Sequence, residues 1–255
     1  MCRLDIVIPV YNEGENIVQV LEALLQSVQT PFRVLICYDH ETDTTLEVVQ
    51  RFQSNLPLEI QFVKNTGKGP HGAVLSGFRC STAEAVLVLP ADDTYNASII
   101  DRMFLKLSEG CDIVVASRFI VGGCMQGGPW LKTVLVRLAA FTLYRLGHLP
   151  TRDATNGFRL FSRRVLEEIE IESSNGFAYS LELLVKCHRI GWKIGEVPAL
   201  WFERSGRKSR FRVIRWLPEY LRWYVYAFGM TYSRQRGVSN TADIGRPVRR
   251  ESREA

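Results

Sequence analysis

Two adjacent carboxylates, Asp92 and Asp93, follow a run of five apolar residues (85–89) and Pro90 in this chain of 255 residues. Such a run is typical of a buried strand, and open α/β sheets bind ligands at the carboxyl ends of their strands. Adjacent carboxylates repel each other, so they need solvent, a cation or hydrogen-bond donors nearby. One interpretation is a divalent cation held beside a diphosphate. The other is a helix N-cap, because Asp and Thr often begin helices.

Residues suited to nucleotide contacts follow two earlier apolar runs. Pro9, Tyr11 and Glu13 lie at the end of the first predicted strand and in the loop that opens the first predicted helix. An aromatic ring can stack on a base, and the amino end of a helix favours phosphate. Asp39 ends the second predicted strand, a position suited to ribose or base contacts. Taken singly, each of these residues fits an ordinary loop or cap equally well.

A cationic loop, residues 204–210, contains Arg204 and Lys208 and could neutralise the charge of a departing diphosphate. A solvated basic surface is the alternative interpretation. Asp153 precedes a turn at 156–159 and is expected to face the same ligand-binding cleft as this cationic loop. The glycine-rich turn at 65–72 lacks the spacing of a P-loop, and no dinucleotide-binding glycine motif follows the first strand.

These residues must be positioned by strands that alternate with helices. Apolar periodicity predicts strands over 4–10, 32–38, 58–63, 85–89 and 112–116, with helices over 15–27, 43–53 and 99–107 among them. We also expect helices over 130–146 and 180–189 and a strand over 193–202. This alternation predicts an α/β fold with a mostly parallel sheet flanked by helices on both faces.

The charge is distributed unevenly along the chain. Residues 203–255 carry 13 Lys/Arg against 5 Asp/Glu, whereas the remainder carries 19 against 22. No recognised nucleic-acid module accompanies the basic end, so we expect no nucleic-acid partner. Lys132, Arg137 and Arg145 interrupt the most apolar long stretch, which excludes a membrane span there. Six scattered cysteines and the absence of a leader sequence indicate a cytoplasmic protein.

Taken in order, the motifs resemble the family 2 glycosyltransferases of GT-A fold, especially the polyprenyl- or dolichyl-phosphate hexose (mannose) synthases. The segments that carry the resemblance lie between Leu4 and Arg212: 8–13, Asp39 with Asp43, 91–93, 116–118, 153–160, 195–198 and 204–209. Two positions depart from the family pattern. Pro90 stands where the family usually has an aspartate, and 38–41 replaces a pair of aspartates followed by Gly-Ser.

The resemblance implies a role for each matching residue. It implies nucleotide contacts for Pro9, Tyr11, Glu13, Asp39 and Ala91, and acceptor contacts for Arg118, Lys132, Arg137 and Arg159. It implies a divalent cation, Mg²⁺ or Mn²⁺, on Asp92 with Asp93. Arg204 and Lys208 would neutralise the leaving diphosphate, and Asp153 would be the base if the acceptor is a hydroxyl.

By the same resemblance we expect a single GT-A glycosyltransferase domain over 1–210, with a nucleotide-binding half (about 1–118) and an acceptor half (about 119–210). An aromatic and basic amphipathic helix over 211–236 would pack on the domain or lie on a membrane surface, before a disordered tail over 237–255. The expected activity is inverting transfer of a hexose from GDP-mannose or a UDP-sugar, most simply to polyprenyl phosphate. A hydroxyl acceptor, a sugar-nucleotide pyrophosphorylase and a non-catalytic nucleotide-sugar-binding relative are the alternatives.

Overall fold

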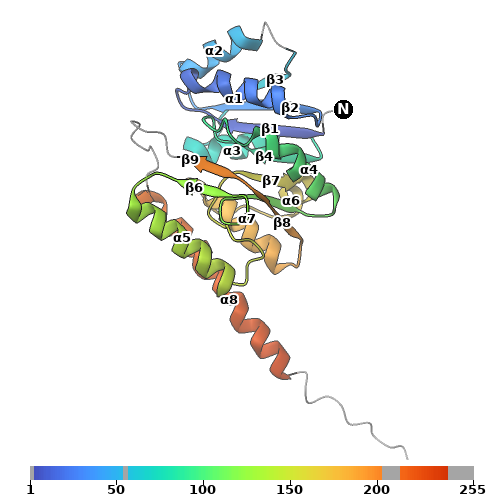
Figure 1. The fold of residues 1–255 in the computed structure, drawn as a ribbon, viewed down its shortest axis with the longest axis vertical. Coiled ribbons are helices and arrows are strands. Elements are labelled where there is room, and N and C mark those ends of the chain that lie inside the picture. Colours follow the sequence, from blue (N-terminus) through green and yellow to red (C-terminus); the bar gives the residue numbers. More distant parts are fainter. Residues whose placement is uncertain (1–2, 54–56, 203–212, 241–255) are drawn as a thin grey trace, which may run out of the picture.

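Seven strands form one sheet in the computed structural model, which describes residues 3–53, 57–202 and 213–240 (Figure 1). Their order is β3-β2-β1-β4-β7-β5-β8, and all are parallel except β7, which is antiparallel to both neighbours. The strands are β1 (Leu4–Pro9), β2 (Phe32–Tyr38), β3 (Ile60–Lys64), β4 (Ala85–Val88), β5 (Ile113–Ser117), β7 (Arg159–Ser162) and β8 (Ile194–Pro198). The predicted, mostly parallel α/β architecture is confirmed.

Helices cover both faces of this sheet. The helices are α1 (Gly14–Ser27), α2 (Thr44–Gln53), α3 (Gly69–Cys80), α4 (Ile100–Ser108) after a short 3₁₀ turn (Ala97–Ile99), α5 (Trp130–Arg145), α6 (Arg163–Glu168), α7 (Ala178–Arg189) and α8 (Val213–Asn240). Because side chains alternate along a strand, Ile6 and Ile8 pack in the core beneath α1, α2 and α4. Val7 faces the opposite core, which contains α3, α6 and α7.

The strand expected over 193–202 is in fact two strands in different sheets. β8 pairs with β5, whereas β9 (Leu200–Phe202) leaves the main sheet and pairs with β6 (Cys124–Gln126). The prediction of one strand was wrong because β9 pairs with β6, a strand that lies far away in the sequence. The periodicity of the sequence predicts neither β6 nor the pairing of β9 with it.

The predicted helix over 211–236 corresponds to α8, which packs along α7 and beside α5 (Figure 1). Its side chains Trp223 and Ala227 are buried, so one face belongs to the core. The helix continues through Asn240, so the expectation of disorder was wrong for 237–240, since an established helix propagates easily. The rest of that tail, 241–255, lies outside the described residues. No described helix is both long and apolar enough to cross a membrane.

A glycine before α7 fixes the place of α8. Gly176 has a φ of +60°, and a Cβ there would lie 2.6 Å from the indole of Trp216. The same indole meets the ring of Phe177 edge-on, with the centroids 6.1 Å apart. The aromatic ring of α8 therefore rests directly on backbone that only glycine leaves uncovered.

We predict that Gly176→Ala lowers the free energy of unfolding by about 2–3 kcal/mol, because backbone strain adds to a clash with Trp216. Urea denaturation followed by circular dichroism measures the change. Gly191→Ala is the matched control, since its φ is +81° but a Cβ would meet nothing within 4 Å. Equal losses in the two variants would show that the indole contact contributes nothing.

Candidate active site

One edge of the sheet gathers most of the predicted site residues. The carboxyl ends of the parallel strands β1, β2, β4 and β5 all lie there, together with the amino end of the antiparallel β7. The loops that follow or precede these ends carry Tyr11, Asp39, Asp92, Arg118 and Asp153. The edge includes the switch between β1 and β4, where open α/β sheets bind ligands.

The loop after β1 is held by two side chains from the start of α2. Asn12 has a φ of 54°, and its N–H donates to both carboxylate oxygens of Asp43 at 3.1 and 3.0 Å. The N–H of Glu13 donates to the Thr45 hydroxyl at 2.9 Å. Tyr11, between Pro9 and this anchor, stays half exposed. An aromatic ring on a fixed loop is suited to stacking on a base.

Asp43 is the anchor that the sequence interpretation did not assign. Its carboxylate also accepts from the N–H of Thr45 at 2.9 Å, so Asp43 caps α2. In the sequence, this cap was indicated by an Asp two residues before Thr45, within the first turn of the predicted helix over 43–53. The link to Asn12, 31 residues away, was not visible without the fold.

Asp39 lies half-buried at the end of β2 and is fixed by Asn65. The side-chain amide of Asn65 donates to Asp39 and also to the carbonyl of Gly69, while its oxygen accepts from the N–H of Gly67 at 2.7 Å. Asn65 therefore organises the glycine-rich turn and presents Asp39 at the edge of the sheet.

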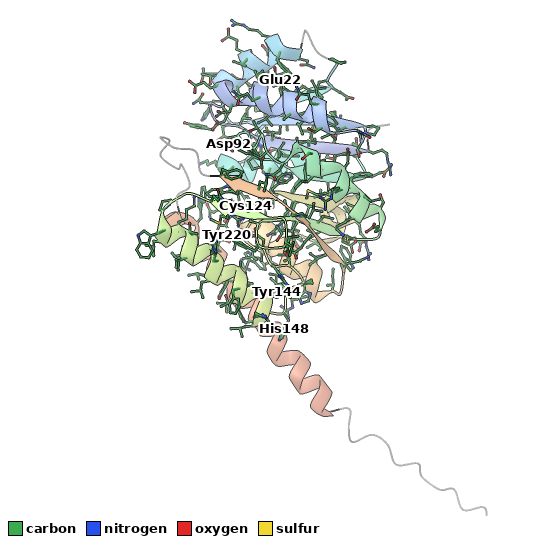
Figure 2. The ribbon with its side chains drawn as sticks, in the orientation of Figure 1. Glu22, Asp92, Cys124, Tyr144, His148 and Tyr220 are labelled. Atoms are coloured by element: carbon green, nitrogen blue, oxygen red, sulfur yellow. The ribbon has the colours of Figure 1, made fainter. Side chains whose placement is uncertain are left out.

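The two adjacent carboxylates have different environments. Asp92 is exposed, next to the buried Ala91. The carboxylate of Asp93 accepts from the N–H groups of Tyr95 and Asn96, each at 3.0 Å, and from the Asn96 side-chain amide. Burial raises the pKa of Asp93, although these hydrogen bonds partly oppose the shift. Asp93 therefore holds the turn that precedes the 3₁₀ helix, whose N-cap residue is Asn96, whereas Asp92 is exposed at the sheet edge (Figure 2).

Asn96 connects this loop to β9. Its amide donates to the carbonyl of Leu200 at 2.8 Å, and its oxygen accepts from the N–H of Leu200 at 2.8 Å. The rings of Tyr95 and Phe202 meet edge-on at 5.0 Å. Asn96 is almost fully buried and was missed in the sequence, because its partners are 104 residues away.

A buried ion pair joins the end of β5 to the loop before β7. Arg118 donates to Asp153 through Nε at 2.7 Å, Nη2 at 2.9 Å and its backbone N–H at 2.9 Å. Asp153 is fully buried, and its carboxylate also accepts a hydrogen bond from the hydroxyl of Thr155. Asp153 therefore holds Arg118 in place, and this enclosed position does not suit the base expected from the sequence.

Two other residues that were expected to contact the acceptor, Arg159 and Lys132, do not line the pocket described below. Arg159 is completely buried and donates to the carbonyls of Ser180 and Ala154, and burial lowers its pKa to about 10. Its role is therefore structural in this arrangement. The Lys132 ammonium lies 5.3 Å from the centre of the Trp201 ring and does not line the pocket described next.

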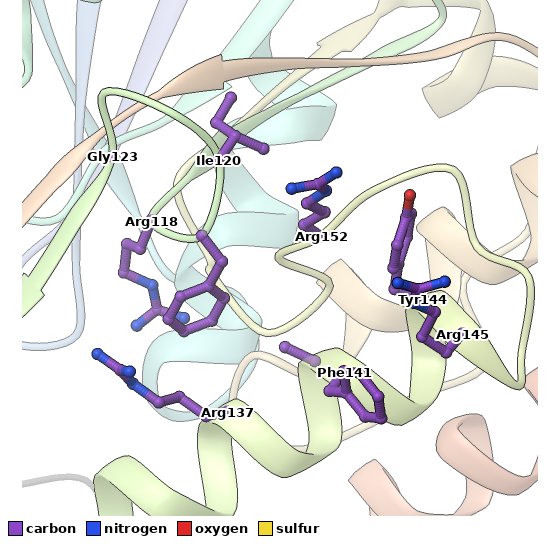
Figure 3. A pocket seen from close by; sticks show the side chains of 10 residues that line it. Arg118, Ile120, Gly123, Arg137, Phe141, Tyr144, Arg145 and Arg152 are labelled. Carbon is purple, nitrogen blue, oxygen red and sulfur yellow. The ribbon is translucent and has the colours of Figure 1, made fainter.

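An open pocket of about 500 Å³ lies between the end of β5 and α5, and arginines line it (Figure 3). Arg118 and Arg137 flank Phe119, with their guanidinium carbons 5.2 and 5.9 Å from the ring centre. The residues that line the pocket are Arg118, Phe119, Ile120, Gly123, Arg137, Ala140, Phe141, Tyr144, Arg145 and Arg152. Four arginines with no acidic residue in the lining favour a phosphorylated ligand.

Arg145 and Arg152 approach Tyr144 at the other end of the pocket (Figure 3). Neither residue was among the acceptor contacts expected from the sequence.

The carboxylates fit a metal that is held mainly by its substrate. Asp92 is exposed, while the oxygens of Asp93 are engaged by Asn96 and by backbone N–H groups. Within the described ranges, no three His, Cys, Asp or Glu side chains form a metal-binding group. Mg²⁺ commonly uses one or two carboxylates together with substrate phosphates, so Asp92 alone is compatible with such a cation. Arg204 and Lys208 lie outside the described residues.

We predict that Asn96→Ala lowers the free energy of unfolding by about 2–3 kcal/mol, because it leaves the Leu200 N–H and carbonyl without their partner and removes the side-chain donor to Asp93. Chemical denaturation measures this loss. Asn175→Ala is the control, since Asn175 is exposed and its side-chain amide donates to the hydroxyl of the neighbouring Ser174. A loss no larger than the control's would contradict the role given to Asn96.

We predict that Asp153→Asn costs about 3–5 kcal/mol of unfolding free energy, because it leaves the Arg118 guanidinium buried without a countercharge. Thr155→Val removes one neutral partner of the same guanidinium and should cost only about 1 kcal/mol. Thermal and urea unfolding of both variants test the difference. Similar losses of unfolding free energy in the two variants would show that the ion pair stabilises the fold no more than a neutral hydrogen bond does.

Solved structures share this fold. Glucosyl-3-phosphoglycerate synthase from Mycobacterium tuberculosis, solved with Mn²⁺, UDP-glucose and glycerol 3-phosphate, has a TM-score of 0.67 and 16% identity, covering 89% of this chain and 80% of its own. A mannosyltransferase from Pyrobaculum calidifontis, solved with GDP-mannose and Mn²⁺, has a TM-score of 0.60 and 19% identity, covering 84% and 59%. At these identities the likeness shows the fold alone, and it confirms the expected GT-A fold.

Curated sequences give the closer relationship. A polyprenol monophosphomannose synthase from Mycolicibacterium smegmatis is 27% identical, covering 84% of this chain and 86% of the relative. A dolichol-phosphate mannosyltransferase from Pyrococcus furiosus is 26% identical over 86% of this chain, which spans 62% of that relative's length. The family described as "Glycosyl transferase family 2" matches residues 5–170, which is well over half of the chain. The chain therefore belongs to glycosyl transferase family 2.

Proposed function

We propose that this protein transfers a hexose, with inversion, from a nucleotide-diphosphate sugar to a polyprenyl phosphate. The arginine-lined pocket at the ligand-binding edge of the sheet is the observation that carries the proposal. Relatives named as a polyprenol monophosphomannose synthase and a dolichol-phosphate mannosyltransferase support it. GDP-mannose and UDP-sugars are the donor classes to compare, since neighbours of this fold were solved with each nucleotide type.

The donor occupies the edge formed by β1, β2 and β4 in this proposal. Tyr11 stacks on the base, while Pro9, Glu13 and Asp39 shape the nucleoside site around the anchored loop. The diphosphate lies near Ala91 and Asp92. A divalent cation on Asp92, Mg²⁺ or Mn²⁺, would supply Lewis-acid neutralisation of the diphosphate.

The acceptor phosphate occupies the pocket among Arg118, Arg137, Arg145 and Arg152 in this proposal. Guanidinium groups match phosphate oxygens geometrically and orient them by charge-assisted hydrogen bonds. One phosphate oxygen then attacks the anomeric carbon as the bond to the donor diphosphate breaks. Arg204 and Lys208, from the segment after β9, are assigned to the negative charge that develops on the leaving group.

A phosphate acceptor needs no strong general base, because its oxygen is already ionised. A hydroxyl acceptor would need one, and Asp153 is fully buried against Arg118. The geometry therefore favours the phosphate acceptor over the hydroxyl. Since polyprenyl phosphates reside in bilayers, we further propose that the protein acts while peripherally bound to a membrane surface.

The test is nucleotide release from a panel of UDP- and GDP-sugars, with polyprenyl phosphate, with and without Mg²⁺ or Mn²⁺. We expect turnover with one donor, dependent on both the lipid and the cation. Asp92→Ala should lower kcat/KM by about 100-fold or more, because diphosphate charge is then poorly neutralised. Glu22→Ala, an exposed carboxylate on α1 away from the edge, is the control (Figure 2). Donor binding without turnover on any lipid phosphate would refute the acceptor.

In the same assay, Arg137→Ala should raise the KM for polyprenyl phosphate about tenfold or more, since one charge-assisted hydrogen bond to phosphate is lost. The KM for the donor should stay unchanged. Arg51→Ala, on exposed α2, is the matched control. An equal rise in both KM values would place Arg137 outside the acceptor site.

A further inference from the structure

We propose that the exposed face of α5 is a docking surface for an anionic phospholipid membrane. The surface, called here the α5 stripe, consists of Trp130, Leu131, Val134, Leu135, Leu138 and Phe141. The proposal deepens the proposed function and rests on it for the reason a membrane is needed. Its structural evidence is independent of catalysis.

The α5 stripe exposes far more apolar surface than a helix on a domain normally does. Every member is more than half exposed, from 51% for Val134 to 76% for Trp130. The only buried side chains on α5 are Ala140 and Leu143. A contiguous apolar patch of this kind marks an interaction site rather than an ordinary surface.

The stripe has the geometry of a surface-bound helix. At 3.6 residues per turn, its six members fall within an arc of about 140°, and they extend about 16 Å along the axis. Figure 1 shows α5 at the lower left margin of the molecule. A helix in this position can lie in the plane of a membrane with its apolar face inserted.

The charge around the stripe favours anionic lipid. Between Asp112 and Asp153, the sequence holds five Lys/Arg residues and no Asp or Glu. Arg137 and Arg145 are exposed on α5 itself. Cations beside an inserted apolar face attract anionic headgroups, and each one near the surface adds to binding.

α8 lies beside α5 and carries exposed apolar side chains of its own. The hydroxyls of Thr142 and Tyr224 are hydrogen-bonded at 2.7 Å, which holds α8 beside α5. On α8, Leu217, Leu221 and Val225 are also exposed, whereas Trp223 is buried against the body. The sequence analysis considered membrane contact for the C-terminal helix, and the structure adds α5 as the larger apolar element.

A bilayer fits better than a second copy of the chain. Pairing two α5 stripes would bring together two segments that carry only positive charge. The pocket supports the same occupant, because Phe141 belongs to the stripe and also lines the arginine-rich pocket. A lipid phosphate could then enter among the arginines while its polyprenyl chain stays in the bilayer.

The experiment is co-sedimentation of the full chain with vesicles of phosphatidylcholine alone or with phosphatidylglycerol. We expect binding to the anionic vesicles, and we expect Leu135→Gln/Leu138→Gln to reduce the partition coefficient about tenfold. Leu105→Gln/Ile190→Gln is the matched control, since these two apolar residues are as exposed but lie away from α5. Equal unfolding temperatures would establish that all three proteins are folded.

Binding that is unchanged in the α5 variant, or no binding by the wild-type protein, would overturn the proposal. A wild-type dimer that the α5 variant converts to monomer without vesicle binding would overturn it too, in favour of a second copy. Turnover on a short, water-soluble prenyl phosphate tests the catalytic proposal separately. Vesicle binding through the stripe without any turnover would refute only the proposed activity, and turnover without vesicle binding would refute only the docking surface.

Discussion

The buried ion pair between Arg118 and Asp153 is the constraint on which the arginine-lined pocket depends. A charge enclosed in a protein interior is tolerated only when it is paired and hydrogen-bonded, and here three donors of Arg118 converge on one carboxylate. The pair fixes the start of the chain that forms the pocket and the start of the loop that returns to β7. Arg137, carried by α5, lies beside the Phe119 ring that follows this fixed point, with its guanidinium carbon 5.9 Å from the ring centre.

A second connection, made by Asn96, crosses the same edge of the sheet between the loop after β4 and β9. Asn96 binds the Asp92–Asp93 loop on one side and the backbone of Leu200 on the other. β9 therefore cannot move independently of the loop that follows β4. The carboxyl-terminal strand of the two-stranded sheet and the Asp92–Asp93 loop are therefore held together by one side chain.

The sequence allowed the sheet to be predicted because buried parallel strands are continuous apolar runs, as in Ala85–Val88 and Phe32–Tyr38. It also placed Tyr11, Asp39, Asp92 and Arg118 at the ends of strands, where the structure has them. The features that the sequence did not show all depend on contacts between distant residues. Asp153 was expected to be the base for a hydroxyl acceptor, and nothing local shows that it is paired with Arg118, 35 residues away.

The same limit explains the exposed face of α5. Its sequence is apolar around most of the helix, and only tertiary contacts decide which side meets the body. Sequence reasoning could exclude a membrane span from the interrupting charges. It had no means of showing that the apolar residues between those charges remain on the surface.

The reversed direction of β7 has a consequence for where this chain tolerates sequence change. Because β7 runs against β5, the chain leaves the sheet after Arg118 and returns at Asp153 through the same edge. The intervening 119–152 form an excursion whose base is closed by the ion pair between Arg118 and Asp153 and by hydrogen bonds from Thr151 and Arg152 to Glu196. Its β6 pairs with β9, and its Leu143 and Leu149 join the core that contains α7. Sequence changes on the outer face of this excursion, away from those contacts, therefore leave the strands β1, β2 and β4 undisturbed.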